Sequence, residues 1–176
     1  MQKFASLSDA IALAEFAHRS QLDKAGLPYI EHPKRVLAKV QAQGALPYVQ
    51  IAAILHDVTE DTRFTAQMLL DLGFSEAAVE VIKLLDRDTS SEIFDIIHQG
   101  RDVGGVVKGK KWYIALGPDG RDEFYYQQIR QNPGAVTVKK SDIEDNLSPW
   151  RLSYLPEATQ ARLQEKYRKA LEILNG

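Results

Sequence analysis

Apolar residues recur every three to four positions along most of the chain, which is the spacing of one buried face of an α-helix. In the first third, this pattern predicts helices at about residues 6–21, 33–44 and 47–56. A serine stands at the start of the first, a proline near the start of the other two, and Gly44 after the second, as is typical of helix ends. The segment 23–29 contains glycine and proline without periodicity, so we expect a loop there.

The same reasoning predicts three shorter helices in the middle of the chain and two at its end. Thr65, Ser75 and Ser90 or Ser91 are suitable N-caps for the shorter ones. The last two helices are expected from Pro133 towards Pro149 and from about Glu157 to Leu174, with the apolar face of the latter formed by Ala161, Leu163, Tyr167, Leu171 and Leu174.

Between these groups, residues 103–126 have a different character. Glycines are frequent, β-forming residues cluster at 106–107 and 112–114, and Pro118-Asp119-Gly120 precedes the aromatic run 124–126. This pattern favours a β-hairpin inserted at about 103–126. Its aromatic residues suggest a cover for a pocket or a surface for self-association, and their packing on cross-strand partners is an equal alternative.

Composition limits the classes of function. A length of 176 residues with 44% apolar residues suits one globular domain, 1–176. There are no cysteines, so disulfides and cysteine metal sites are excluded. No apolar run approaches the roughly 20 residues that cross a bilayer, and we expect a cytoplasmic protein without membrane contacts. The net charge is −2, with 22 basic and 24 acidic residues mixed along the chain, which argues against nucleic acid as a partner.

Four residues have the right side chains to bind a divalent cation: His32, His56, Asp57 and Asp142. Imidazole suits Zn²⁺, Mn²⁺, Fe²⁺ or Co²⁺, and carboxylates add charge and hard oxygen ligands. A single histidine in a helical protein is more often an ordinary core or surface residue. The adjacent pair 56–57 is more informative, because it closes a run of small apolar residues at the expected buried end of a helix.

Further polar residues lie close to these four in sequence. Glu60 and Asp61 follow Asp57 at three and four residues, near enough to act on a water in the same site. A solvated loop is an equally good reading of the pair. Asn146 lies four residues after Asp142, on the same face of a predicted helix, where it would suit a substrate hydroxyl, unless residues 142–146 form an exposed polar turn.

Several segments occur together in a recognisable order: His18-Arg19-Ser20-Gln21, Pro28-Tyr29-Ile30-Glu31-His32-Pro33, the run 52–62 around His56-Asp57, and Val138-Lys139-Lys140-Ser141-Asp142 with Asn146. In this combination the chain resembles the HD hydrolase domain of the RelA/SpoT alarmone enzymes and their short single-domain relatives. The resemblance covers nearly the whole chain except about 102–126.

The resemblance implies an all-α HD-domain helical bundle that binds one divalent metal ion, Mn²⁺ first among the possibilities, through His32, His56, Asp57 and Asp142. It implies that Glu60 and Asp61 assist the attacking water. It further implies that the substrate is a nucleotide and that Tyr29 and Asn146 line its site.

Asp23 departs from the pattern of the long alarmone hydrolases, which have a base-stacking cation at this point. A carboxylate does not make a cation–π contact, so guanine recognition does not follow from the resemblance. Cations are nevertheless needed near a phosphoryl group, and those closest in sequence to the motif segments are Lys24, Arg35, Lys139 and Arg151.

Three functions are compatible with these residues. The first is a metal-dependent phosphohydrolase acting on a nucleotide phosphate or pyrophosphate, with guanosine 3′,5′-bis(diphosphate) as one candidate. The second is a nucleotide-binding sensor of the same fold without turnover, which the complete set of ligands and carboxylates disfavours. The third is a helical interaction module, which leaves the motif combination unexplained. A homo-oligomer is compatible with each.

Overall fold

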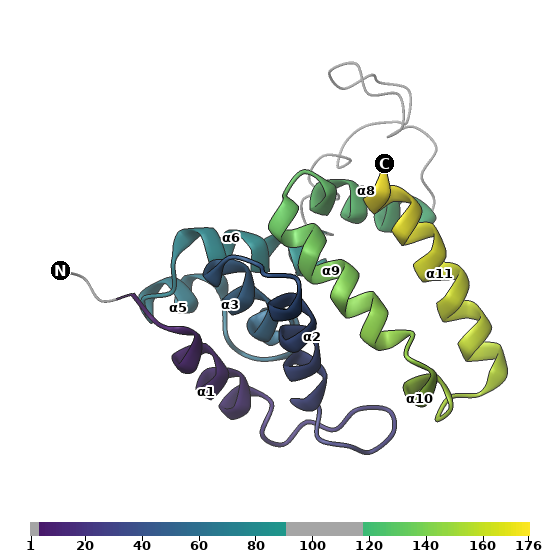
Figure 1. Cartoon of the computed structure of the whole chain (residues 1–176), viewed down its shortest axis with the longest axis horizontal. Coiled ribbons are helices and arrows are strands. Elements are labelled where there is room, and N and C mark those ends of the chain that lie inside the picture. Colours follow the sequence, from purple (N-terminus) through teal and green to yellow (C-terminus); the bar gives the residue numbers. More distant parts are fainter. Residues whose placement is uncertain (1–3, 91–117) are drawn as a thin grey trace.

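The computed structural model of the protein describes residues 4–90 and 118–176 (Figure 1). The regular elements in these two ranges are helices. The first range contains α1 (Leu7–Ala17), α2 (Glu31–Ala42), α3 (Pro47–Leu55), α4 (Val58–Asp61), α5 (Ala66–Asp71) and α6 (Glu76–Leu85). The second contains α8 (Pro118–Arg130), α9 (Pro133–Asn146), α10 (Pro149–Leu152) and α11 (Glu157–Asn175). The all-α prediction is therefore confirmed for the described residues.

Short-range sequence signals set the helix ends largely as predicted. The side chains of Ser6, Thr65 and Ser75 each accept a hydrogen bond from a backbone N–H in the first turn of α1, α5 and α6. Gly44 and Gly73 follow α2 and α5 with φ angles of 69° and 90°, a left-handed conformation that glycine adopts without strain. The predicted helix from Ser90 or Ser91 to Gly100 lies outside the described residues, apart from a helical start at 87–90.

Helix α3 forms the centre of the fold. It packs against α1, α2, α6 and α9 (Figure 1). Its residues Ala52, Ala53, Ile54 and Leu55 are completely buried. The carboxyl-terminal half of α3 is apolar on every side, and such a segment is stable only when other helices surround it. Its carboxyl end, where His56 and Asp57 follow, is consequently held inside the molecule.

The hairpin prediction is wrong for the part that the structure describes. Residues 118–126 lie in α8, and residues 103–117 lie outside the described residues. Phe124, Tyr125 and Tyr126 are buried on α8, which packs against α6, α9 and α11. Proline and aspartate are also favourable in the first turn of a helix, so the same residues that suggested a β-turn begin α8. Burial of the aromatic side chains therefore determines the structure here, rather than their β-propensity.

Helices α9 and α11 run beside each other at the carboxyl-terminal side of the molecule, with α10 between them in sequence (Figure 1). Asn132 caps α9 by accepting a hydrogen bond from the Ala135 backbone N–H. Among the described residues, no helix combines the length and the apolar character needed to cross a membrane.

Candidate metal centre

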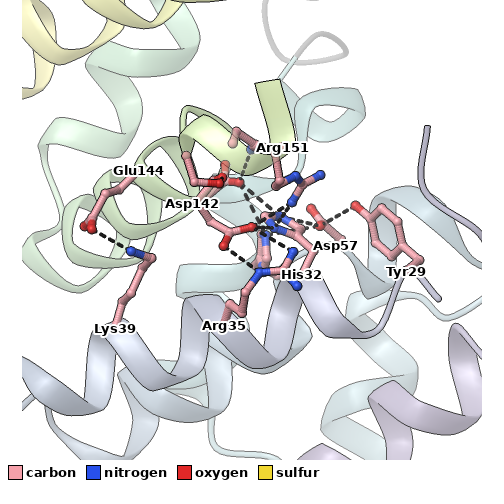
Figure 2. A network of polar contacts seen from close by, with 12 residues as sticks. Tyr29, His32, Arg35, Lys39, Asp57, Asp142, Glu144 and Arg151 are labelled. Carbon is pink, nitrogen blue, oxygen red and sulfur yellow. Dashed lines mark hydrogen bonds and ion pairs between the residues drawn. The ribbon is translucent and has the colours of Figure 1, made fainter. Parts of the chain in front are cut away.

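The four predicted ligands converge from four places in the fold. Figure 2 shows three of them, His32, Asp57 and Asp142, pointing toward one another. His32 lies in the first turn of α2, His56 follows α3, Asp57 precedes α4, and Asp142 lies on α9. The His32 Nε2 atom is 3.2 Å from Asp142 Oδ1 and 3.7 Å from Asp57 Oδ2. The His56 Nε2 atom is 3.1 Å from Asp57 Oδ2 and 4.0 Å from Asp142 Oδ1. Ligand atoms of His32, His56 and Asp57 lie within 4.8 Å of one another.

Both imidazoles are fixed through Nδ1, which leaves Nε2 facing the carboxylates. His56 Nδ1 lies 2.8 Å from the Ala53 carbonyl oxygen, which can only accept a hydrogen bond, so Nδ1 carries the proton. His56 Nε2 is buried and has no hydrogen-bond partner. An unpartnered buried nitrogen beside ionised carboxylates is what a metal ligand presents, so these side chains fit a divalent ion.

The electrostatics of the cluster also favour a cation. Burial opposes ionisation of Asp57, but the His56 and His32 imidazoles hold the pKa of its carboxyl well below the usual range. Burial likewise opposes a charge on His32, but hydrogen bonds to Asp142 and Asp145 raise the pKa of its imidazole to about 9. The carboxylates thus remain charged at neutral pH and stabilise positive charge at the centre.

Lys139 is half-buried, with its side chain 12% exposed, and lies behind Asp142. Its Nζ lies 2.8 Å from Asp142 Oδ2, and Asn146 Nδ2 donates to Asp142 Oδ1 at 2.6 Å. Burial opposes ionisation of Asp142, but the Lys139 charge and the His32 hydrogen bond keep the pKa of its carboxyl well below the usual range. Lys139 and Asn146 therefore fix the ligand carboxylate on α9.

The two auxiliary carboxylates on α4 are exposed and have different partners. Glu60 accepts a hydrogen bond from the Arg87 backbone N–H at 3.0 Å. Asp61 accepts one from Gln21 Nε2 at 3.1 Å. Partial desolvation raises the pKa of the Glu60 carboxyl above its ordinary value. The negative charge of Asp57 acts in the same direction. Both carboxylates follow Asp57 directly, within one turn of helix.

Tyr29 connects the ligand cluster to a cleft. Its hydroxyl donates to Asp57 Oδ2 at 2.6 Å, and its ring packs against those of His18 and His32. The cleft has a volume of about 360 Å³. Its lining consists of loop residues and of side chains from α9, α10 and α11: Gln21, Leu22, Asp23, Lys24, Ala25, Tyr29, Asn146, Trp150, Arg151, Tyr154, Leu155, Leu163 and Tyr167.

Of the predicted substrate contacts, Tyr29, Lys24, Asn146 and Arg151 thus share one cleft, whereas Lys139 lies at the metal cluster. Asp23 also lines the cleft. Its Oδ1 accepts hydrogen bonds from the backbone N–H groups of Ala25 and Leu27, at 2.8 and 3.0 Å. The carboxylate that replaces the expected cation therefore closes the 23–27 loop on itself.

Sequence reasoning missed Asp145, which lies beside the centre. The polar run 142–146 is compatible with an exposed turn, yet the Asp145 side chain is only 2% exposed. Its partners are His32, Arg35 and Arg151. The available signal was its position three residues after Asp142 on the same helix, which places both carboxylates on one face.

No protein-family model matches the chain. The chain is 30% identical over 168 residues to a probable GTP pyrophosphokinase of Mycobacterium leprae, covering 94% of this chain and 18% of that protein. It is 30% identical over 161 residues to a guanosine-3′,5′-bis(diphosphate) 3′-pyrophosphohydrolase of Borreliella burgdorferi, covering 90% of this chain and 20% of that protein. The chain thus spans about a fifth of the length of these curated relatives.

Among solved structures, the chain matches that of a metazoan ortholog of SpoT that hydrolyses ppGpp, with a TM-score of 0.72. The match covers 100% of this chain and 89% of the other, at 20% sequence identity. This structural match shows that the two proteins have the same fold. The sequence matches relate the chain to bacterial proteins named as GTP pyrophosphokinases and as guanosine-3′,5′-bis(diphosphate) 3′-pyrophosphohydrolases.

Proposed function

Since this chain is a relative of the RelA/SpoT alarmone enzymes and has the HD fold, we propose that it is a metal-dependent phosphohydrolase that removes pyrophosphate or phosphate from a nucleotide, with guanosine 3′,5′-bis(diphosphate) as the first candidate. The observation that supports this most directly is the geometry of His32 and His56. Each turns Nε2 towards the carboxylates of Asp57 and Asp142, and the cluster borders a cleft that contains two cationic side chains.

His32, His56, Asp57 and Asp142 would hold the ion, and we propose Mn²⁺. A mixed set of imidazole and carboxylate ligands suits Mn²⁺, and it also suits Zn²⁺, Fe²⁺ and Co²⁺. When bound, such an ion polarises a phosphoryl oxygen and lowers the pKa of its water towards neutrality.

Carboxylates on α4 would accept the proton of the attacking water. Glu60 and Asp61 are exposed carboxylates one turn beyond Asp57, and the raised pKa of Glu60 brings it nearer to neutrality, which favours proton acceptance. Gln21 orients Asp61 by donating a hydrogen bond to it. Tyr29 orients Asp57 in the same way.

The remaining proposed residues would bind the substrate. Lys24 and Arg151 line the cleft and would stabilise the negative charge of the phosphates. Asn146 also lines it, and its amide would reach a sugar hydroxyl. Lys139 contributes its charge from behind Asp142.

A nucleotide screen on the purified protein tests this proposal. The metal-free protein is loaded separately with Mn²⁺, Zn²⁺, Fe²⁺ and Co²⁺. Each form is assayed with guanosine 3′,5′-bis(diphosphate), with nucleoside mono-, di- and triphosphates and with NADPH, and the products are identified. We expect phosphate or pyrophosphate release that requires the ion and is abolished in His56→Ala. Stoichiometric metal with nucleotide binding but no release would identify a sensor instead, and absence of metal binding would overturn the proposal altogether.

A further inference from the structure

The buried carboxylate of Asp145, on α9, contacts three basic side chains: His32, Arg35 and Arg151. Figure 2 shows these three side chains close together at the site. The Asp145 Oδ2 atom lies 2.7 Å from His32 Nδ1 and 2.7 Å from Arg151 Nη1. Arg35 donates from Nε to Oδ1 at 2.7 Å and from Nη2 to Oδ2 at 3.2 Å. A buried carboxylate is stable only with such partners, and here the partners include a proposed metal ligand and a residue of the cleft.

The contact with Asp145 fixes which ring nitrogen of His32 faces the proposed metal centre. His32 Nδ1 lies 2.7 Å from Asp145 Oδ2 and 2.7 Å from Arg151 Nη1, whereas Nε2 lies 3.2 Å from Asp142 Oδ1. When a cation takes the place of the Nε2 proton, the proton that remains on Nδ1 would be accepted by the Asp145 carboxylate, which keeps the lone pair of Nε2 directed at the metal centre. With the opposite tautomer, a proton on Nε2 would occupy the place that a bound cation would take. We propose that Asp145 is a positioning residue that holds His32 in its metal-binding orientation; this inference rests on the proposed metal-dependent function.

The two arginines give Asp145 a second role. Arg35 binds both of its oxygens and lies 4.6 Å from the centre of the Trp150 ring, so it fixes the carboxylate from the α2 side. Arg151 binds the same carboxylate and also lines the cleft. Asp145 therefore holds a metal ligand and a substrate-facing arginine at the same time.

This arrangement predicts effects that can be separated. Loss of the Asp145 charge should weaken metal binding through His32 and substrate binding through Arg151. Loss of Arg151 should weaken substrate binding and leave metal binding close to wild type. Arg151 Nη1 lies 2.7 Å from His32 Nδ1, but Asp145, which Arg35 still fixes, remains to accept the Nδ1 proton.

The experiment measures Mn²⁺ affinity of the metal-free protein by calorimetric titration, and KM and kcat at saturating Mn²⁺. In Asp145→Asn we expect Mn²⁺ affinity to fall by about 10- to 100-fold and KM to rise. In Arg151→Gln we expect a raised KM with Mn²⁺ affinity close to wild type. Glu144→Gln is the matched control, because it removes the same charge from the neighbouring residue, whose side chain is 66% exposed and pairs with Lys39 instead.

Asp145→Glu provides a second variant in case Asp145→Asn does not fold. It keeps the charge that the arginines need but moves the carboxylate by one methylene group, so we again expect weaker Mn²⁺ binding at an unchanged thermal midpoint. Mn²⁺ affinities of the Asp145 variants equal to that of Glu144→Gln would overturn the inference while leaving the proposed function intact. If the wild-type protein itself binds no divalent ion, the proposed function fails first and the inference fails with it.

Discussion

The two halves of the site differ in how firmly their side chains are held. His32, His56 and Asp142 are each less than 5% exposed, and the contacts of each are fixed by side chains or backbone of the core helices. Glu60 and Asp61, on the four-residue helix α4, are exposed. The difference corresponds to their proposed tasks, since a metal ligand needs a fixed geometry and a group that exchanges protons with water needs solvent.

The comparison implies that substitutions in the two halves impair different properties of the protein. Within the buried half, loss of one side chain should remove the ion or leave a charge uncompensated. On α4, the ion should remain and only the chemical step should slow. The predictions below test this division, beginning with the largest effect.

Replacing His56 with alanine should remove both bound metal and activity. Its Nε2 faces Asp57 at 3.1 Å, and no other described side chain supplies an imidazole at that position. We expect less than stoichiometric Mn²⁺ by metal analysis and a loss of activity of about a thousandfold. The α-helical circular dichroism spectrum should persist, because Ala52, Ala53, Ile54 and Leu55 keep α3 packed. Normal turnover with stoichiometric metal would remove His56 from the centre, and Asp57→Ala repeats the test on the adjacent ligand.

Replacing Lys139 with methionine should destabilise the metal-free protein by about 3 kcal/mol, because a buried Asp142 loses its paired ammonium. A bound cation would compensate for the same charge, so Mn²⁺ should raise the thermal midpoint of this variant more than that of the wild type. Lys140→Met is the control, since the Lys140 ammonium bonds to Asn175 at the surface. An equal Mn²⁺ effect on both variants would show that Lys139 does not balance the metal site.

Asp61→Asn and Glu60→Gln should leave metal content unchanged and lower kcat. A positioned acid or base contributes at least about a hundredfold to a rate, and that is the loss we expect for whichever carboxylate accepts the proton. The two variants also separate the roles of a residue held by Gln21 and one held by the Arg87 backbone. If either variant loses its metal instead, the division between the buried and exposed halves is wrong.

How far the sequence predicted this arrangement depends on the range of the interactions involved. N-caps such as Ser6 and Ser75 bond to the first turn of their own helix, so the neighbouring residues alone are sufficient to predict where these helices begin. The 124–126 aromatic run was misassigned because its packing partners lie on α6, α9 and α11. Strand propensity and helical burial compete in such a segment, and only the tertiary structure shows which prevails.

The same dependence on distant partners limits which residues of the site can be predicted from the sequence. The ligand residues were predicted because their types and order are distinctive, whereas Asp145 looked like one more polar residue in the run 142–146. Its partners His32 and Arg35 are more than 100 residues earlier in the chain. A charged residue can be assigned to the interior only when the partner that compensates its charge is known.

Tyr29 belongs to neither half, and its replacement by phenylalanine should have the smallest effect. The hydroxyl donates to Asp57 Oδ2 at 2.6 Å, while the ring stays packed against His18 and His32 in the variant. A hydrogen bond to a charged group is worth about 1.5 kcal/mol, so kcat/KM should fall about tenfold. If Asp57 is held firmly by the rest of the buried half, Mn²⁺ affinity should change by less than kcat/KM does. A larger loss of Mn²⁺ affinity would mean that Tyr29 is part of the metal site, and the buried half would then extend into the wall of the cleft.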